Sequence, residues 1–452
     1  MLFRSGLSLY LRRKRDTLDD AKWLKVDPWK YPEISRYTEG EKDSAGNVTD
    51  PVIVPLGYVV EQAPMPDNAA PERPLMYKYH SMKPIGLTSK MLQEHVLVYG
   101  PTGTGKTSRA LMHFVLAFAR RGDAVVIPDF KYPKLNGGFM QAIALFRRFG
   151  LAAYPVLPYT RGGYNIPVFD YIQTVQDGRD LAAILVPTPE YGDSDSSFYK
   201  LTQQIILGAV FKVVAASPTP NFKEAIRIMN QPQAAFEAWL TGTSDAVAIE
   251  QLARFMAEKK DWNGFVTGII NALEAFDDDR VSETFTSVPG RNFDPETFVK
   301  EGGLLYWGVP SDKMRTSRGE TITRVFDNWL TNQIVRLRNE VSRTGPQRSV
   351  RLMYDEAPSI GRLRNVLRSV GTLRDSDICL IFGIQNESQM RIVYGEDIWD
   401  AIVQNLATRL IFPTGFQDDA AKTLSTYLGD REIRVRINSH SGTGSLNPEP
   451  GS

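Results

Sequence analysis

Hydrophobic residues along this chain gather in short, nearly continuous runs, a pattern typical of strands buried on both faces of a parallel sheet. Such runs predict strands at 95–99, 123–127, 151–157, 303–310, 350–354, 378–384 and 405–412. Apolar residues at helical spacing predict helices between and after them, at 108–120, 138–148, 321–341 and 418–428. Strands that alternate with helices in this way predict an α/β fold.

The stretch 176–286 has a different pattern, because strand signals fade and helical ones dominate. Helices are expected at 179–185, 198–216, 221–229, 232–240, 246–257 and 263–275. We therefore predict an all-α domain at 176–286, inserted between two parts of the sheet domain at 81–175 and 287–430. Residues 1–80 are predicted to be an arm or linker with short strands, followed by a turn at 81–86, and 431–452 a flexible polar tail.

A Gly-rich loop joins the strand at 95–99 to the helix at 108–120. Its residues, which are candidates for cofactor binding, are Gly100, Pro101, Thr102, Gly103, Thr104, Gly105, Lys106 and Thr107. Strand, loop and helix in this order match a Walker A motif, whose three glycines permit positive φ and bring backbone N–H groups close to phosphate. An ordinary Gly-rich turn does not account for both flanks.

The last two residues of this loop have their own chemistry. Lys106 can reach the β- and γ-phosphates as a mobile charge, and we take it as a catalytic candidate. The hydroxyl of Thr107 is a hard oxygen ligand suited to Mg²⁺. The motif therefore predicts ATP and Mg²⁺ as cofactors.

The strand at 350–354 ends in two adjacent acids, Asp355 and Glu356, as in a Walker B motif. Asp355 would act on Mg²⁺, directly or through water, and Glu356 would polarise the attacking water. Two acids after a strand are common, so the motif gains its weight from the Walker A loop upstream.

Two further strands end in polar residues whose part the sequence leaves open. Asp129 and Lys131 follow the strand at 123–127, and either face the ligand crevice or belong to a surface turn. Gln385 follows the strand at 378–384, and either senses the γ-phosphate or begins a surface loop. We take Asp129 as a candidate for cofactor binding and Gln385 as a candidate for catalysis.

Composition narrows the functions further. The 452 residues have a formal net charge of +1, so the whole chain has no strong attraction for nucleic acid. DNA contacts must come from local patches, or from a ring that gathers patches of several subunits.

The single cysteine, Cys379, excludes a disulfide framework and a multi-cysteine zinc site within the chain. No apolar run reaches the roughly 20 residues of a membrane-spanning helix.

The motifs resemble those of the type IV coupling proteins, the ATPases of bacterial conjugation and type IV secretion. The resemblance runs from 92 to 429. It is carried by the loop 100–107, the Asp-Glu-x-x-x-x-Gly run at 355–361, Gln385 with Gln389 and then Tyr394-Gly395, Arg374 before that strand, the Asn-Pro element at 164–167, and Asp129-Phe130-Lys131, where the family has Asp-Pro-Lys.

The resemblance implies a RecA-like P-loop motor that forms a homo-hexameric ring and uses ATP to move DNA, with its bound relaxase, towards a secretion channel. It also implies that the nucleotide lies between subunits and that Arg374 is a catalytic finger for the neighbouring subunit. The alternative for Arg374 is an ion pair within the chain, with Asp375 or Asp377.

The resemblance further implies a protein of the bacterial cytoplasm, peripheral at the inner membrane, that works with inner-membrane components of a type IV secretion system. Family members usually carry an N-terminal membrane anchor, which this sequence does not show, so whether the ring forms without a partner or membrane stays open. Two other functions also stay open: a secretion ATPase that recruits protein effectors rather than DNA, and a recruiting platform with little hydrolysis. Glu356 and Arg374 disfavour the platform, because binding alone needs neither a water activator nor a finger.

Overall fold

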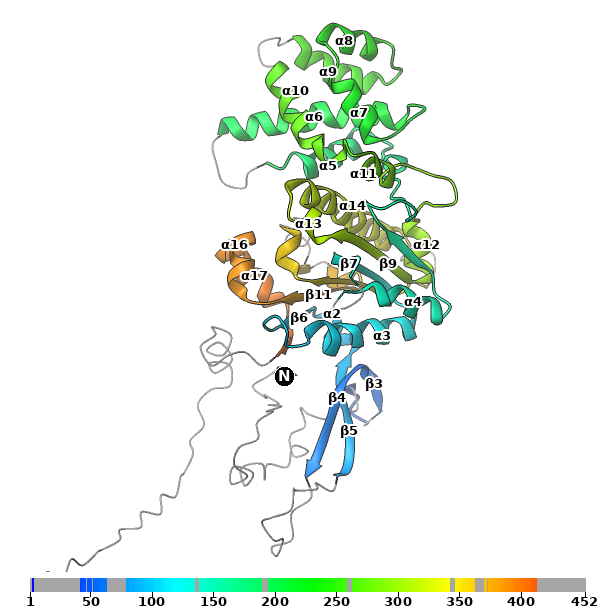
Figure 1. Cartoon of the computed structure of the whole chain (residues 1–452), viewed down its shortest axis with the longest axis vertical. Coiled ribbons are helices and arrows are strands. Elements are labelled where there is room, and N and C mark those ends of the chain that lie inside the picture. Colours follow the sequence, from blue (N-terminus) through cyan, green and yellow to red (C-terminus); the bar gives the residue numbers. More distant parts are fainter. Residues whose placement is uncertain are drawn as a thin grey trace, which may run out of the picture.

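The structure is a computed structural model, and it describes most of the chain between residues 79 and 412 (Figure 1). The described residues are 2–3, 41–45, 47–50, 52–62, 79–134, 138–188, 194–257, 262–341, 346–361, 370–371 and 373–412. The predicted helix at 418–428 and tail at 431–452 lie outside these residues, as does most of the predicted arm at 1–80.

A parallel sheet forms the centre of the structure. Its strands are β6 (Val96–Tyr99), β7 (Ala124–Tyr132), β8 (Ala153–Val156), β9 (Gly303–Pro310), β10 (Val350–Asp355), β11 (Ile378–Ile384) and β12 (Thr408–Ile411), with the short β1 (Leu2–Phe3) antiparallel to β12. The strand order is β1-β12-β6-β11-β10-β7-β9-β8. Each predicted strand of the sheet is confirmed, and β7 extends past its predicted end at Ile127 to Tyr132.

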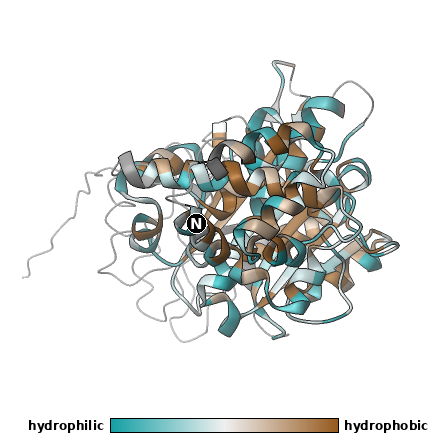
Figure 2. Ribbon diagram, turned by 90° about the horizontal axis from the view of Figure 1, so that it is seen from above, coloured by the Kyte–Doolittle hydropathy of each residue, from teal (hydrophilic) through white to brown (hydrophobic). Residues whose placement is uncertain are grey.

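Alternate residues of the strands face two separate hydrophobic cores, as a sheet covered on both sides requires. In β6, Leu97 and Tyr99 belong to one core, and Val96 and Val98 belong to the other. The first core includes α14 (Ser317–Val341), and the second includes α2 (Ser89–Gln93), α3 (Met112–Arg121) and α4 (Met140–Arg148). Figure 2 shows hydrophilic residues along the outer helix faces and hydrophobic residues towards the middle.

The segment between β8 and β9 is mainly helical, and all of its helices except the last form a layer at one end of the molecule (Figure 1). Its helices are α5 (Val175–Leu185), α6 (Ser194–Ala215), α7 (Phe222–Met229), α8 (Gln233–Thr241), α9 (Ala246–Ala257), α10 (Trp262–Leu273), α11 (Asp279–Thr284) and α12 (Pro295–Glu301). The helices expected in this region are confirmed. The domain boundaries at 176 and 286 stay a prediction, since this layer and one sheet face share a single core.

The remaining helices follow the later strands. They are α13 (Ser311–Met314), α16 (Glu387–Tyr394) and α17 (Glu396–Asn405), with 3₁₀ turns at Val168–Tyr171, Glu274–Phe276 and Ala357–Ile360. Among the described residues, no helix combines the length and apolar character needed to cross a membrane.

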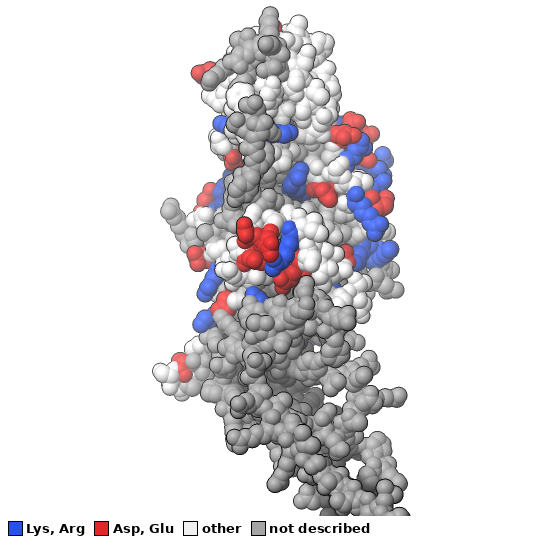
Figure 3. All heavy atoms as spheres, turned by 90° about the vertical axis from the view of Figure 1, so that its left-hand side faces the viewer, with Lys and Arg blue, Asp and Glu red and all other residues white. Residues whose placement is uncertain are grey.

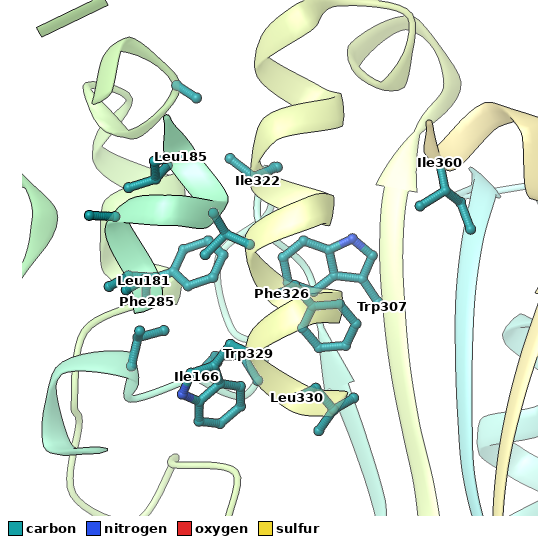
Figure 4. Close-up of a cluster of buried hydrophobic side chains, with 14 of the residues drawn as sticks. Ile166, Leu181, Leu185, Phe285, Trp307, Ile322, Phe326, Trp329, Leu330 and Ile360 are labelled. Carbon is teal, nitrogen blue, oxygen red and sulfur yellow. The ribbon is translucent and has the colours of Figure 1, made fainter. Parts of the chain in front are cut away.

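Helix α14 connects the helical layer to the sheet (Figure 4). On one side, Phe326 stacks on Trp307 of β9 with ring centroids 4.1 Å apart and planes inclined by 10°. The indole Nε1 of Trp307 also donates to Thr323 Oγ1 at 3.1 Å. Towards the layer, α14 packs near Leu181 and Leu185 of α5. A shift of α14 would therefore disturb its contacts with both the sheet and the helical layer.

The region before the sheet is more ordered than the sequence predicts. Strands β4 (Val52–Gln62) and β5 (Tyr79–Thr88) pair antiparallel, and a second small sheet pairs β2 (Glu41–Lys42) with β3 (Val48–Asp50). The predicted turn at 81–86 is wrong, because these residues lie within β5. Pairing with β4 overrides the turn signals of Pro84 and Gly86, and Val54 and Leu87 are fully buried in the second core.

We predict that Phe326→Ala lowers the free energy of unfolding by about 3–5 kcal/mol, because it leaves a cavity against Trp307. Chemical unfolding followed by tryptophan fluorescence measures this loss. Phe149→Ala is the control, since Phe149 is 41% exposed, and its cost should stay within about 0.5 kcal/mol. Equal losses in the two variants would show that the Trp307 stack does not hold the layers together.

Candidate nucleotide-binding site

Three neighbouring strands end at one edge of the sheet, and their last residues meet there. Strand β11 lies between β6 and β10, with Ile384 opposite Tyr99 and Gly383 opposite Asp355. Because the strands are parallel, the polar residues that follow them share this edge. The Thr102 hydroxyl donates to Gln385 Oε1 at 2.9 Å, joining the Gly-rich loop to the end of β11.

The loop 100–107 has the shape of an anion cradle. Gly103 and Gly105 have φ of +83° and +87°, and no atom lies within 4 Å of a Cβ built at Gly103. The prediction of positive φ at Gly100 is wrong. Glycine is needed there for space, because a Cβ at Gly100 would lie 2.7 Å from Phe412 Cβ. After the loop, a π-helical turn (Thr107–Leu111) leads into α3.

Lys106 is held against its own loop. Its ammonium donates to Gly100 O and, at 3.2 Å, to Pro101 O, and the residue is buried. Burial lowers the pKa of Lys106, while the nearby Asp355 carboxylate acts in the opposite direction. A phosphate in the cradle would replace the two carbonyls with a stronger, charged partner for this ammonium.

The two acids after β10 lie beside the loop. Asp355 is 6% exposed, and its Oδ2 accepts a hydrogen bond from Thr107 Oγ1 at 2.8 Å. Glycine at 383 leaves room for this carboxylate, because a Cβ there would lie 2.9 Å from Asp355 Oδ1. Glu356 has a left-handed backbone, with φ of 59° and ψ of 46°, a strained state that often accompanies a functional position.

Lys131 belongs to this group, which settles the choice that its sequence pattern leaves open. Strand β7 is the neighbour of β10, and the Lys131 ammonium lies 3.3 Å from Asp355 Oδ2 and 3.0 Å from Glu356 Oε1. Burial lowers the pKa of Lys131, but these two carboxylates outweigh burial and raise it. The extension of β7 beyond Ile127, which places Lys131 here, was not evident from the sequence.

Asp129 is held by protein donors, and its predicted contact with a cofactor stays a prediction. It is buried, and its Oδ1 accepts from Lys131 N at 2.9 Å. Its Oδ2 accepts from Phe139 N at 2.6 Å and from Tyr306 OH at 2.9 Å. With its carboxylate used by protein donors, Asp129 fixes the end of β7 that presents Lys131.

Arg374 lies at the opposite edge of the sheet from the other candidates. It precedes β11, whereas Gln385 follows it, and a strand of seven residues separates them by on the order of 20 Å. Arg374 is exposed, and the ion pairs of the described residues include none between Arg374 and Asp375 or Asp377. Within one chain, the structure does not bring Arg374 to the Walker motifs.

A buried pair behind the acids was missed by sequence reasoning. The hydroxyl of Tyr354, the residue before Asp355, donates to Asp327 Oδ1 on α14, and both side chains are buried. Burial raises the pKa of Asp327 to about 7, and the hydrogen bond from Tyr354 opposes this rise. No signal in the sequence separates Asp327 from an acid on the exposed face of an amphipathic helix.

The residues at this edge fit a nucleotide with its metal ion. Thr107 Oγ1 and Asp355 Oδ2, which lie 2.8 Å apart, are the hard oxygen donors that Mg²⁺ takes. The open face of Gly103 and the start of the helix after Thr107 supply backbone N–H groups for phosphate.

The strand order, with β11 between β6 and β10, and the Gly-rich loop after β6 define a RecA-like P-loop fold. The family model of the type IV secretion-system coupling protein DNA-binding domain matches residues 80–448, more than half of the chain. The chain therefore belongs to this family. No curated protein sequence matches it.

Three solved structures are similar to this chain. The plasmid coupling protein TrwB with a non-hydrolysable GTP analogue has a TM-score of 0.55 at 17% identity, covering 75% of this chain and 76% of that one. TrwB with ADP and Mg²⁺ has a TM-score of 0.53 at 18% identity, covering 71% and 70%. The conjugative coupling protein TrwBdeltaN70 with sulphate has a TM-score of 0.53 at 17% identity, covering 73% and 72%. At these identities the likeness shows the fold.

We predict that Asp129→Asn destabilises the protein without nucleotide by about 1–3 kcal/mol, because an amide N–H₂ would face a buried donor. Chemical unfolding measures the change, with the exposed Asp312→Asn as the control. The affinity for ADP should fall far less than it would after loss of a direct ligand. A variant of unchanged stability that no longer binds nucleotide would restore Asp129 as a cofactor contact.

Proposed function

We propose that this protein is an ATP-hydrolysing coupling protein that recruits DNA, with its bound relaxase, and pumps it to a type IV secretion channel in conjugation. The observation that carries the proposal is the meeting of the Walker side chains and Gln385 at one sheet edge. Membership of the coupling-protein family supports the conjugative role. The nucleotides bound by the similar TrwB structures support the choice of cofactor.

The geometry supports the following division of work at the site. The loop amides bind the phosphates of ATP, and Lys106 leaves the carbonyls of Gly100 and Pro101 to contact them. Thr107 and Asp355 hold Mg²⁺, which neutralises phosphate charge. Glu356 orients the attacking water and takes its proton. Gln385, tied to the loop through Thr102, positions groups at the γ-phosphate.

The site of one chain is completed by a second copy in this proposal. Arg374 is exposed at the far edge of the sheet, where it is free of the ion pairs that sequence reasoning left open. His95 helps to fix its segment: Nδ1 accepts from Leu380 N, so Nε2 carries the proton donated to Val370 O at 2.8 Å. A head-to-tail hexamer would bring Arg374 to the neighbour's ATP.

DNA contacts are expected away from the face formed by α16 and α17. On that face Arg391 pairs with Glu396 and Asp400, and acidic side chains gather (Figure 3). Such a face does not attract a phosphate backbone.

We place the protein at the cytoplasmic side of the inner membrane, with secretion-system components as partners.

A specific observation favours a second candidate function, the recruitment of protein effectors. The helical layer exposes large apolar residues, with Phe198 at 57% and Leu201 at 46% on α6 and Val247 at 54% on α9. Phe198 and Leu201 stand three positions apart and therefore lie on one face of α6. A contiguous apolar patch, rather than a single exposed residue, is what marks a protein contact.

We predict that single- or double-stranded DNA stimulates ATP hydrolysis and that stimulation rises steeply with protein concentration, because a ring must assemble. Lys106→Ala and Glu356→Gln should each reduce turnover by roughly 100-fold or more. Lys134→Ala, an exposed lysine close in sequence to Lys131, is the control and should leave turnover unchanged. Hydrolysis that is indifferent to DNA would favour protein cargo, and absence of hydrolysis would contradict the motor.

A further inference from the structure

Lys131 occupies the place where the site needs a cation. Its ammonium lies 3.3 Å from Asp355 Oδ2, the same oxygen that accepts the Thr107 hydroxyl at 2.8 Å. It also lies 3.0 Å from Glu356 Oε1. One ammonium thus bridges the two acids that are proposed to bind the metal ion and to activate water.

The backbone of Lys131 is held in place by the buried side chain of Asp129. Asp129 accepts the backbone N–H of Lys131, and its other oxygen binds Phe139 N and Tyr306 OH. Glycine at 138 leaves room for this carboxylate, since a Cβ there would lie 2.8 Å from Asp129 Oδ2. The buried anchor fixes the backbone of Lys131, while its four-carbon stem has rotatable bonds through which the ammonium can change partners.

Mg²⁺ and the Lys131 ammonium cannot share Asp355 Oδ2 closely, because both are cations. When Thr107 and Asp355 take the ion, the ammonium must move, and its four-carbon stem allows this without a backbone change. The terminal phosphate of ATP would then be the anion available to the displaced ammonium, because Glu356 is proposed to orient the water that attacks this phosphate. A diphosphate offers no such group.

We propose that Lys131 is a second phosphate-binding lysine. Without nucleotide its ammonium bridges Asp355 and Glu356, and when Mg²⁺ binds with ATP the side chain moves so that the ammonium contacts the γ-phosphate. The inference rests on the proposed ATP site. It makes Lys131 the residue that distinguishes ATP from ADP, whereas Lys106 serves both nucleotides.

The test is equilibrium binding of fluorescent ADP and of a fluorescent non-hydrolysable ATP analogue, both with Mg²⁺, to the full chain. Lys131→Met should weaken the ATP analogue by about 10- to 100-fold, the range of a lost charge-assisted hydrogen bond, and change ADP by less than about twofold. It should also lower the Mg²⁺ concentration that half-saturates ADP binding, since the competing ammonium is gone. Lys134→Met, which removes a charge close by in the sequence, should change none of these values.

Lys131→Arg keeps the charge and should recover part of the preference for the ATP analogue, which guards against a fold defect in Lys131→Met. Equal weakening of both nucleotides in Lys131→Met, or no weakening of either, would overturn the proposal while leaving the ATP site intact. If the wild-type chain bound neither nucleotide, the proposed function itself would fail, and the inference with it.

Discussion

The pairing of β11 between β6 and β10 is the constraint on which the site depends. These strands are parallel, so their carboxyl ends reach one edge, and their register decides which side chains meet there. A slip of one residue would turn every side chain of a strand to the other face. The contact between Thr102 and Gln385 and that between Thr107 and Asp355 both require this register.

The same strands connect the site to the rest of the molecule. Tyr354 ties β10 to Asp327 of α14, and α14 in turn stacks Phe326 on Trp307 of β9. Helix α14 also packs against the helical layer (Figure 4). A change at the two acids therefore has a direct, buried route to the layer that would receive cargo.

Much of the fold could be predicted because its elements carry strong local signals. The runs of buried strands, the loop 100–107 and the helices of the inserted layer all follow from residue pattern. The prediction failed where tertiary pairing outweighs local signals. Pro84 and Gly86 indicate a turn, yet pairing with β4 makes their segment a strand.

The site was predictable in its two motifs and less so in their surroundings. Asp129 and Lys131 stand two positions apart, and no pattern shows that one anchors the loop and the other reaches the acids. Asp129 has its anchoring role because Tyr306 OH and Phe139 N donate to its carboxylate. Tyr306 is far away in the sequence, and Phe139 contributes only a backbone N–H, which no sequence pattern marks. The reason for glycine at position 100 was also not predictable. A side chain there would collide with Phe412, which follows a strand far away in the sequence.

If two copies of the chain complete each nucleotide site, as proposed, two variants with different defects should restore activity when they are mixed. Lys106→Ala chains lack a working cradle and Arg374→Ala chains lack the finger, so each alone should be inactive. Co-expressed in equal amounts, they should recover about a quarter of wild-type ATP hydrolysis, because a random head-to-tail ring pairs an intact cradle with an intact finger at that frequency. A mixture no more active than its two components would show that Arg374 does not act on a neighbour's nucleotide, and would contradict the composite site.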